Sequence, residues 1–302
     1  MKFTVRVPAT SANLGSGVDC LGLALSLYLT VHVESADENS FVFSRGFDQP
    51  IPDNDNFYLK AMHYYADKSC KVLPKLRVVM ETDIPVCRGL GSSSSALIAG
   101  LLTACTVLGD KPDNELILRL AAQMEGHPDN VTPALFGGFT LAYYDGESLI
   151  YRRYNAPGVC YIAAVPSYRL STQMARELLP KEIPLKTAIS QLQRAVVLSG
   201  ELSSGRTSDL ATLTKDGFFT PFRKSLMPGY DAAIDAARNS GAICAMTSGA
   251  GPTILALCER EYAADIGRAM ETALAENGVS AQIHTLSADN TGAVITVNEA
   301  ER

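Results

Sequence analysis

A glycine- and serine-rich segment, Gly-Leu-Gly-Ser-Ser-Ser-Ser at residues 89–95, directly precedes a long apolar stretch of the chain. Glycines allow a tight turn, and the free N–H groups at the start of a helix attract anions. Serine hydroxyls can bind phosphate or a metal ion. The segment is therefore a candidate polyphosphate site. Helix-capping serines beside an ordinary glycine turn would give the same pattern, and the segment is neither a Walker A nor a Rossmann sequence.

A second polar cluster, Glu-Gly-His-Pro-Asp-Asn at residues 125–130, follows a predicted helix. A carboxylate at this place could complete the oxygen shell of Mg²⁺ together with phosphates and a serine hydroxyl. The alternative is a helix end followed by a Pro-Asp-Asn turn, with His127 as an ordinary loop histidine. The cluster alone does not decide between these interpretations.

A third segment, Ser-Gly-Ala-Gly-Pro at residues 248–252, lies between two predicted strands. Its small residues would allow close approach of the backbone to a ligand, or simply a sharp turn. On its own this segment is compatible with either interpretation.

Hydrophobic periodicity predicts the elements that must position these segments. In the first half, strands are expected at 2–7, 21–34, 40–44, 76–82 and 137–144, and helices at 56–69, 96–108 and 114–124. In the second half, we expect strands at 160–165, 242–246 and 253–258, helices at 172–179, 186–203, 229–240 and 262–277, and two final strands. This mixture predicts the α+β class. A polar stretch at 145–158 suggests two lobes, 1–155 and 156–302, which suits a chain of this length.

Composition limits the possible partners. The net charge of −6 and the pI near 5.3 argue against a broad electrostatic contact with nucleic acid or an anionic membrane. Seven cysteines without a C-x-x-C pair indicate reduced thiols, and the N-terminal residues lack a secretory apolar segment. The longest apolar run, 96–108, is too short to span a bilayer. We therefore expect a cytoplasmic protein without nucleic-acid or membrane partners, and homodimer formation stays open.

Taken in order, the motifs resemble those of the GHMP small-molecule kinases. The three family motifs correspond to Pro-Ala-Thr-Ser-Ala-Asn-Leu-Gly at 8–15, the segment at 89–95, and Ser-Gly-Ala-Gly-Pro-Thr at 248–253. The similarity is greater still to the members that act on L-homoserine, and it spans residues 4–257. It rests on Asp19, on 125–131 with Pro133-Ala134, on 171–172, 175–176 and 179–180, and on 221–223 with 228–229.

The resemblance implies a fold and an activity. The N-terminal lobe would be similar to domain 2 of ribosomal protein S5, the C-terminal lobe would be ferredoxin-like, and ATP would bind in the cleft between them. The expected reaction is ATP-dependent phosphorylation of the side-chain hydroxyl of a small amino acid, with L-homoserine as the expected substrate.

The resemblance also implies a nucleotide site with Mg²⁺ as the metal. Ser93 and Glu125 would be the Mg²⁺ ligands, and Asn56 would lie near the adenine. The triphosphate would be surrounded by Pro85, Arg88, Gly89, Leu90, Gly91, Ser92, Ser93, Ser94, Ser95 and Gly249.

For the acceptor, the resemblance implies that Asn13, Asp19, His127 and Asn130 surround the amine and hydroxyl, and that Arg176 and Arg223 hold the carboxylate. A guanidinium fork suits a carboxylate and an aspartate suits an ammonium group.

Catalysis by this family would depend on positioning and charge neutralisation more than on a general base. Asn130 is expected to position the hydroxyl, and Thr172 to lie near the γ-phosphate or the substrate. Asp129 is either a base or a residue that supports the site from behind.

Two places depart from the family pattern. Residues 216–223 read Asp-Gly-Phe-Phe-Thr-Pro-Phe-Arg where a histidine and a tyrosine are usual, and Gln191 replaces an asparagine. These changes affect the acceptor side. The alternatives are a related kinase acting on threonine or another small hydroxy compound, and a non-catalytic nucleotide-binding sensor.

Overall fold

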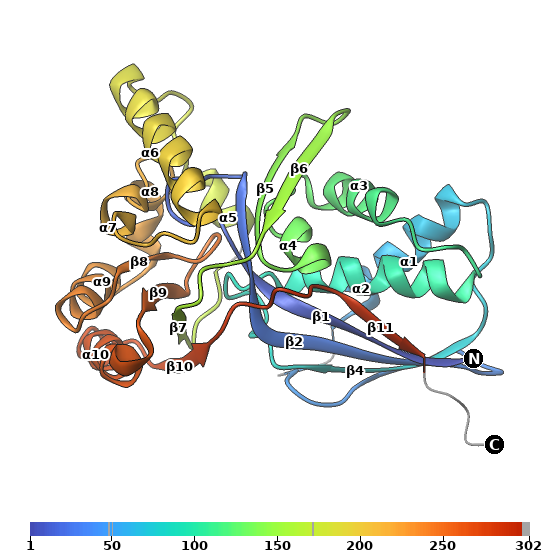
Figure 1. Ribbon diagram of the computed structural model, residues 1–302. Coiled ribbons are helices and arrows are strands. Elements are labelled where there is room, and N and C mark those ends of the chain that lie inside the picture. Colours follow the sequence, from blue (N-terminus) through green and yellow to red (C-terminus); the bar gives the residue numbers. More distant parts are fainter. Residues whose placement is uncertain (48, 50, 171, 298–302) are drawn as a thin grey trace.

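The computed structural model describes residues 1–47, 49, 51–170 and 172–297, without the side chains of Thr172 and Gln173. Two sheets form two lobes that meet near the middle of the molecule (Figure 1). The strands are β1 (Lys2–Ala12), β2 (Leu21–Ser35), β3 (Ser40–Phe43), β4 (Leu76–Thr82), β5 (Phe139–Tyr144), β6 (Leu149–Tyr154), β7 (Cys160–Pro166), β8 (Cys244–Thr247), β9 (Ile254–Cys258), β10 (Ala281–Leu286) and β11 (Val294–Val297).

Helices complete both lobes. The α-helices are α1 (Phe57–Lys68), α2 (Ser92–Val107), α3 (Asn114–Glu125), α4 (Val131–Phe136), α5 (Thr172–Glu177), α6 (Leu185–Ser203), α7 (Leu210–Leu213), α8 (Thr220–Arg223), α9 (Tyr230–Asn239) and α10 (Ala263–Glu276), and 3₁₀ turns lie at Asp53–Asp55, Lys224–Leu226 and Arg260–Tyr262. Within the described residues, no helix combines the length and apolar composition needed to cross a membrane.

The first lobe is a sheet in the order β11-β1-β2-β4-β3, with the β5–β6 hairpin attached to the other end of β2. Alternation on β1 buries Phe3, Val5 and Val7 and leaves Lys2 and Arg6 exposed, as expected for a sheet covered on one face. The covering layer consists of α1, α2 and α3 (Figure 1). Helix α2 is apolar on nearly all sides because it packs against β1 and both neighbouring helices.

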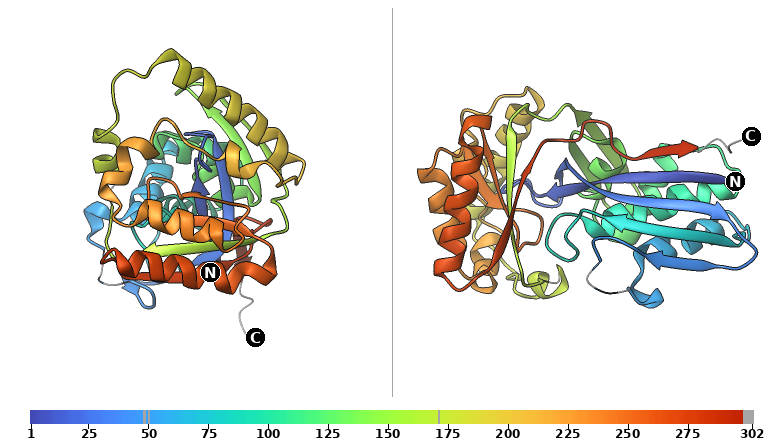
Figure 2. Two further views of the ribbon diagram at one scale, coloured as in Figure 1. Left: turned by 90° about the vertical axis from the view of Figure 1, so that its left-hand side faces the viewer. Right: turned by 90° about the horizontal axis from the view of Figure 1, so that it is seen from below.

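The second lobe has the order β10-β7-β9-β8, all antiparallel, with α9 and α10 on its outer face (Figure 2). The chain order β7-α9-β8-β9-α10-β10 gives the predicted ferredoxin-like arrangement. Tyr161, Ala163 and Val165 of β7 join the core shared with the first lobe, whereas Ile162 and Ala164 face α9 and α10. Both faces of this small sheet are therefore buried.

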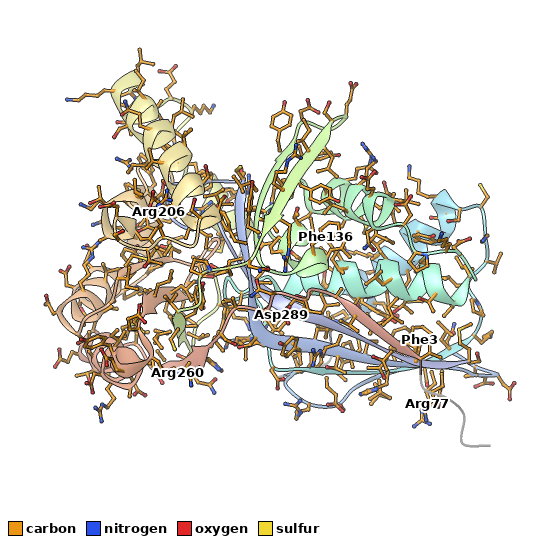
Figure 3. All side chains as sticks on the ribbon, viewed as in Figure 1. Phe3, Arg77, Phe136, Arg206, Arg260 and Asp289 are labelled. Atoms are coloured by element: carbon orange, nitrogen blue, oxygen red, sulfur yellow. The ribbon has the colours of Figure 1, made fainter. Side chains whose placement is uncertain are left out.

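The end of the chain returns to the first lobe, where β11 pairs with β1. Asp289 secures this crossing, as it is buried at the junction of the lobes (Figure 3). Its carboxylate accepts hydrogen bonds from Tyr28, Thr291 and Gly292. The two lobes are thus connected by more than the linker between β6 and β7.

Most predicted elements are present, with one clear correction. The polar stretch 145–158, which we expected to be a boundary without a strand, contains β6 paired with β5. Its side chains are mostly exposed, so it lacks the apolar alternation of a half-buried strand. The predicted boundary at 155/156 falls between β6 and β7 and stays a prediction.

Candidate active site

The glycine-serine segment forms the turn between β4 and α2 and exposes the N-terminus of that 16-residue helix. No side chain caps α2, because the preceding residue is Gly91 in the left-handed conformation, with φ 68°. The first-turn N–H groups of Ser92 and Ser93 therefore remain available to an anion. The local sequence produces a helix start suited to phosphate.

The three motifs meet at this turn. A Cβ at Gly91 would overlap Oγ1 of Thr10, and one at Gly89 would overlap the carbonyl of Ser248. The Ser248 hydroxyl donates to the Gly89 carbonyl over 2.7 Å, and the Asn13 amide donates to the Gly249 carbonyl over 3.1 Å. The glycines are thus required for contact between protein segments as well as for space around a ligand.

Glu125, the last residue of α3, reaches the same turn. Its Oε1 accepts hydrogen bonds of 3.0 Å from the hydroxyls of both Ser93 and Ser94. Burial raises the pKa of the Glu125 carboxyl, and the charge of His127 and the two serine hydrogen bonds oppose that shift. A buried carboxylate and a serine oxygen side by side are hard oxygen donors of the kind that Mg²⁺ prefers. The two predicted metal ligands therefore fit a magnesium ion held between α2 and α3.

The cluster at 125–130 continues from that carboxylate. Asp129 is almost fully buried, and its Oδ1 lies 2.6 Å from Nδ1 of His127. Burial lowers the pKa of His127. The hydrogen bond to Asp129 and the negative charges of Asp129, Glu125 and Asp19 raise it, and the net shift of this pKa is upward. This arrangement fixes the imidazole in the cavity. Asp129 itself is directed at His127, which places it behind the site.

Asn130 lies beside the phosphate turn. Its Oδ1 accepts a hydrogen bond of 2.8 Å from Thr10, which leaves the amide nitrogen without a partner among the described residues. An amide donor with its orientation fixed in this way can bind a hydroxyl oxygen.

The acceptor end of the cavity is built from both lobes. Asp19 has an oxygen 2.9 Å from the guanidinium of Arg176, which belongs to α5. Ligand atoms of Asp19, His127 and Asp129 all lie within 4.8 Å of one another. Two carboxylates this close make the local field favourable for a cation such as an ammonium group. Asn13 holds the Asp19 backbone with a 2.9 Å hydrogen bond.

Arg223, on α8, supplies a second guanidinium. Only 3% of the residue is exposed, and its Nε donates to the Ala175 carbonyl over 3.0 Å. Burial lowers the pKa of Arg223, and the charge of Arg176 adds to that shift. In the described part of the chain no carboxylate lies within ion-pair distance of Arg223. A buried cation without a counter-ion is a suitable binding group for an anionic ligand.

One cavity of about 400 Å³ connects these groups. It contains all six predicted acceptor residues together with Gly89, Gly91, Ser92, Ser93, Glu125, Asp129 and Gly249. A neighbouring cavity of about 350 Å³, largely apolar, shares Cys87, Ser92 and Ser93 with it and contains Asn56. Asn56 caps α1 through Oδ1, and its buried Nδ2 has no hydrogen-bond partner within the part of the chain that the structure describes. The two cavities are adjacent, as expected for a nucleotide base next to its phosphates.

Five predicted nucleotide residues lie differently. Ser94 is buried, lines neither cavity and donates its hydroxyl to Glu125. Pro85 and Arg88 line a third cavity, which shares Thr82, Ile84 and Val86 with the apolar one. The Arg88 guanidinium donates to the carbonyls of Val86, Pro166 and Ser167. The Leu90 side chain is in the core. The buried Ser95 hydroxyl donates to Pro8 and Gly91, so it contributes to the turn and leaves no free donor. Thr172 begins α5, and its side chain lies outside the described part of the structure.

Several cavity residues were not predicted from the sequence. Phe57 lies between the two cavities, and Met124, Leu170 and Phe219 line the acceptor side. Thr10 orients Asn130 from behind. Thr10 lies within the first motif, which was a usable signal, whereas the apolar side chains carry no chemical pattern that distinguishes them from core residues.

Comparison with known proteins defines the class. Family models for the GHMP kinases N-terminal domain and C-terminal domain match residues 56–138 and 188–276. Together they cover more than half of the chain, and the chain belongs to the GHMP kinase family. The two-lobed fold expected from the sequence is thereby confirmed.

The proteins similar to this chain include homoserine kinases. The chain is 39% identical to the homoserine kinase of Clostridium beijerinckii over 295 residues, which covers 97% of this chain and 98% of the relative. Identity to the Thermus thermophilus homoserine kinase is 41%, with 87% and 89% covered. The crystal structure of homoserine kinase from Cytophaga hutchinsonii superimposes with a TM-score of 0.86 at 27% identity, covering 97% of each chain.

Proposed function

We propose that this protein phosphorylates the side-chain hydroxyl of L-homoserine, using ATP and Mg²⁺, to give O-phospho-L-homoserine for threonine biosynthesis. The resemblance to homoserine kinases over nearly the whole chain supports this activity. All seven cysteines are free, which supports a reducing, cytoplasmic location.

The single observation that carries the proposal is the composition of one cavity. At one end it has an uncapped helix N-terminus with the serine and carboxylate oxygens of Ser93 and Glu125. At the other end it has two guanidinium groups and the Asp19 carboxylate, with Asp129 behind the site. The first end suits a metal-bound polyphosphate and the second suits a small zwitterion.

The nucleotide would supply the phosphoryl group, and magnesium held by Ser93 and Glu125 would reduce the charge on its oxygens. The N–H groups at the start of α2 would bind phosphate oxygens and orient the chain of phosphates. Glu125 would also keep Ser93 aimed at that position through their hydrogen bond.

The remaining residues orient the acceptor. Arg223 and Arg176 would hold its carboxylate, and Asp19 its ammonium group. Asn130, fixed by Thr10 next to the phosphate turn, would hold the hydroxyl so that its oxygen points at phosphorus. The oxygen–phosphorus bond would form as the bond to the ADP leaving group breaks, and the hydroxyl proton would pass to an oxygen of the transferred phosphoryl group. His127 fills the space between the two ends and is fixed there by Asp129.

A coupled ADP-release assay with mass spectrometry of the product tests the proposal. Purified protein with Mg-ATP would be given L-homoserine, L-threonine, L-serine and D-homoserine in separate reactions. L-Homoserine should give the highest kcat/KM and a product heavier by one phosphoryl group. A higher kcat/KM for any other acceptor would contradict the choice of substrate, and ADP release without a phosphorylated product would contradict transfer.

A further inference from the structure

The aromatic ring of Phe219 covers the guanidinium of Arg223. The central carbon of the guanidinium lies 4.2 Å from the ring centroid, and both residues line the acceptor cavity. A cation over an aromatic face is attracted by the ring quadrupole, and the attraction is larger where water is excluded. Arg223 is nearly fully buried, so this is such a place.

Two contacts determine the orientation of this guanidinium. Its donors lie in one plane, and its central carbon lies over the ring of Phe219. The Nε hydrogen bond to the Ala175 carbonyl fixes the rotation within the plane. The terminal nitrogens then form a fixed fork, which is the geometry that binds a carboxylate through two parallel hydrogen bonds.

The position of Phe219 is itself fixed by a hydrogen-bonded turn. The Asp216 carboxylate accepts the backbone N–H groups of Phe218, Phe219 and Thr220. Gln191 holds the turn from α6, because its Oε1 accepts the Gly217 N–H over 2.8 Å and its Nε2 lies 3.3 Å from Asp216.

The same amide of Gln191 also reaches the loop that carries Asp19. Its Nε2 donates to the Ser16 carbonyl over 2.9 Å, and Gln191 is buried. One side chain therefore connects the segment that positions Arg223 with the segment that positions Asp19. In the proposed function, Arg223 binds the carboxylate of the amino acid and Asp19 binds its ammonium group.

We propose that Phe219 is a positioning residue for the acceptor. Its ring, held by Asp216 and Gln191, orients the Arg223 fork toward the carboxylate of the amino acid. The inference deepens the proposed function and rests on it. It also gives a role to the two places at which this sequence departs from the family pattern, Gln191 and the stretch that begins at Asp216.

The first experiment compares Phe219→Leu with Phe222→Leu. Both replace a phenylalanine in the same short segment by an apolar residue, but Phe222 is partly exposed and lies outside the acceptor cavity. Phe219→Leu should lower kcat/KM for L-homoserine about tenfold, mainly through KM, with the KM for ATP unchanged. Phe222→Leu should leave kcat/KM for L-homoserine, the KM for L-homoserine and the KM for ATP within about twofold of the unaltered protein. Phe219→Tyr, which keeps the aromatic face, should restore most of the activity.

A double-mutant cycle with Arg223→Ala separates positioning from general packing. If Phe219 acts through the guanidinium, Phe219→Leu should have little further effect on kcat/KM once Arg223 is truncated. Additive losses would show that the ring acts independently of Arg223 and would overturn the inference. Equal losses in Phe219→Leu and Phe222→Leu would also overturn it.

A spectroscopic measurement tests the same contact without turnover. The chain contains no tryptophan, so Phe219→Trp places a single indole against Arg223. Its emission should change saturably with L-homoserine, and the change should disappear in the Arg223→Ala background. Tryptophan emission that does not change when L-homoserine is added would contradict the inference. Failure of the proposed function is distinguishable, since in that case the unaltered protein itself would phosphorylate no amino acid.

Discussion

The two ends of the cavity are built in different ways. The phosphate end is formed mainly by the first lobe and uses backbone N–H groups of a helix start, with hydrogen bonds of 3.0 Å from Ser93 and Ser94 to Glu125. The acceptor end combines long side chains from three separate segments, namely Asp19 after β1, Arg176 on α5 and Arg223 on α8. The acceptor end therefore depends on side chains whose positions are fixed by contacts with other side chains.

This difference indicates a division of roles. Backbone dipoles at a helix start are rigid and accept any phosphate of suitable geometry. Side chains that cross between segments can be changed without disturbing the fold, so they are the natural place for selectivity between acceptors. We therefore expect substitutions at the phosphate end to reduce kcat and those at the acceptor end to raise the KM of the amino acid.

The largest effect is expected for Glu125→Ala. Loss of this carboxylate removes a proposed metal ligand and the acceptor of two serine hydrogen bonds. We expect kcat to fall on the order of 10²- to 10³-fold, the range seen when one charge-stabilising group is lost, with a smaller change in nucleotide affinity. Steady-state kinetics and calorimetric titration with ATP would measure both. Glu115→Ala, at the exposed start of the same helix, is the control and should leave kcat unchanged.

At the acceptor end, Arg223→Ala should lower kcat/KM for L-homoserine by about 10²-fold, because a desolvated charge-assisted hydrogen-bond pair is lost. The KM for ATP should stay within about twofold. Arg238 is an exposed arginine on α9, and Arg238→Ala is the control variant. If Arg223→Ala altered ATP and acceptor equally, the separation of the two ends would be wrong.

The glycine turn is tested by stability. A Cβ at Gly91 would overlap Thr10, whereas Gly109 has nearly the same φ, 71°, with no atom within 4 Å of a Cβ. Gly109→Ala should cost about 1 kcal/mol of unfolding free energy, the penalty for a left-handed alanine. Gly91→Ala should cost more, about 2–3 kcal/mol in total, because the overlap adds to it. Urea unfolding measures both, and equal costs would argue against the close contact.

The smallest effect is expected from Gln191→Leu. It removes the link between the Ser16 loop and the Asp216 turn while keeping the buried volume similar. We expect the KM for L-homoserine to rise about threefold to tenfold, as the hydrogen bonds of Gln191 to Ser16, Asp216 and Gly217 are lost. Gln193 is exposed on the same helix, and Gln193→Leu should change neither the KM for L-homoserine nor the KM for ATP. An unchanged KM in Gln191→Leu would limit the positioning network to Phe219 and Asp216.

Local patterns were sufficient for much of the fold. The bounds predicted for β4 match those observed, and the predicted α1, α3 and α6 differ from the observed helices by at most one residue at either end. Strand β6 was missed because its partly buried and exposed side chains do not alternate as apolar and polar residues, and the short helices α4, α7 and α8 are too brief to show a periodicity. For these segments only contacts with neighbouring elements define the structure.

For the site, the sequence by itself determined the chemical groups. The uncapped start of α2 follows from Gly91 and the serines after it, and the Glu-Gly-His-Pro-Asp-Asn cluster supplied the carboxylates and the imidazole. Only the tertiary structure decided that Arg88 contacts β7, that the Asp129 carboxylate is directed at His127, and that Phe219 covers Arg223. Backbone dipoles are a local property of a few consecutive residues. The direction of a long side chain depends on contacts with residues far away in the sequence, and these exist only in the folded chain.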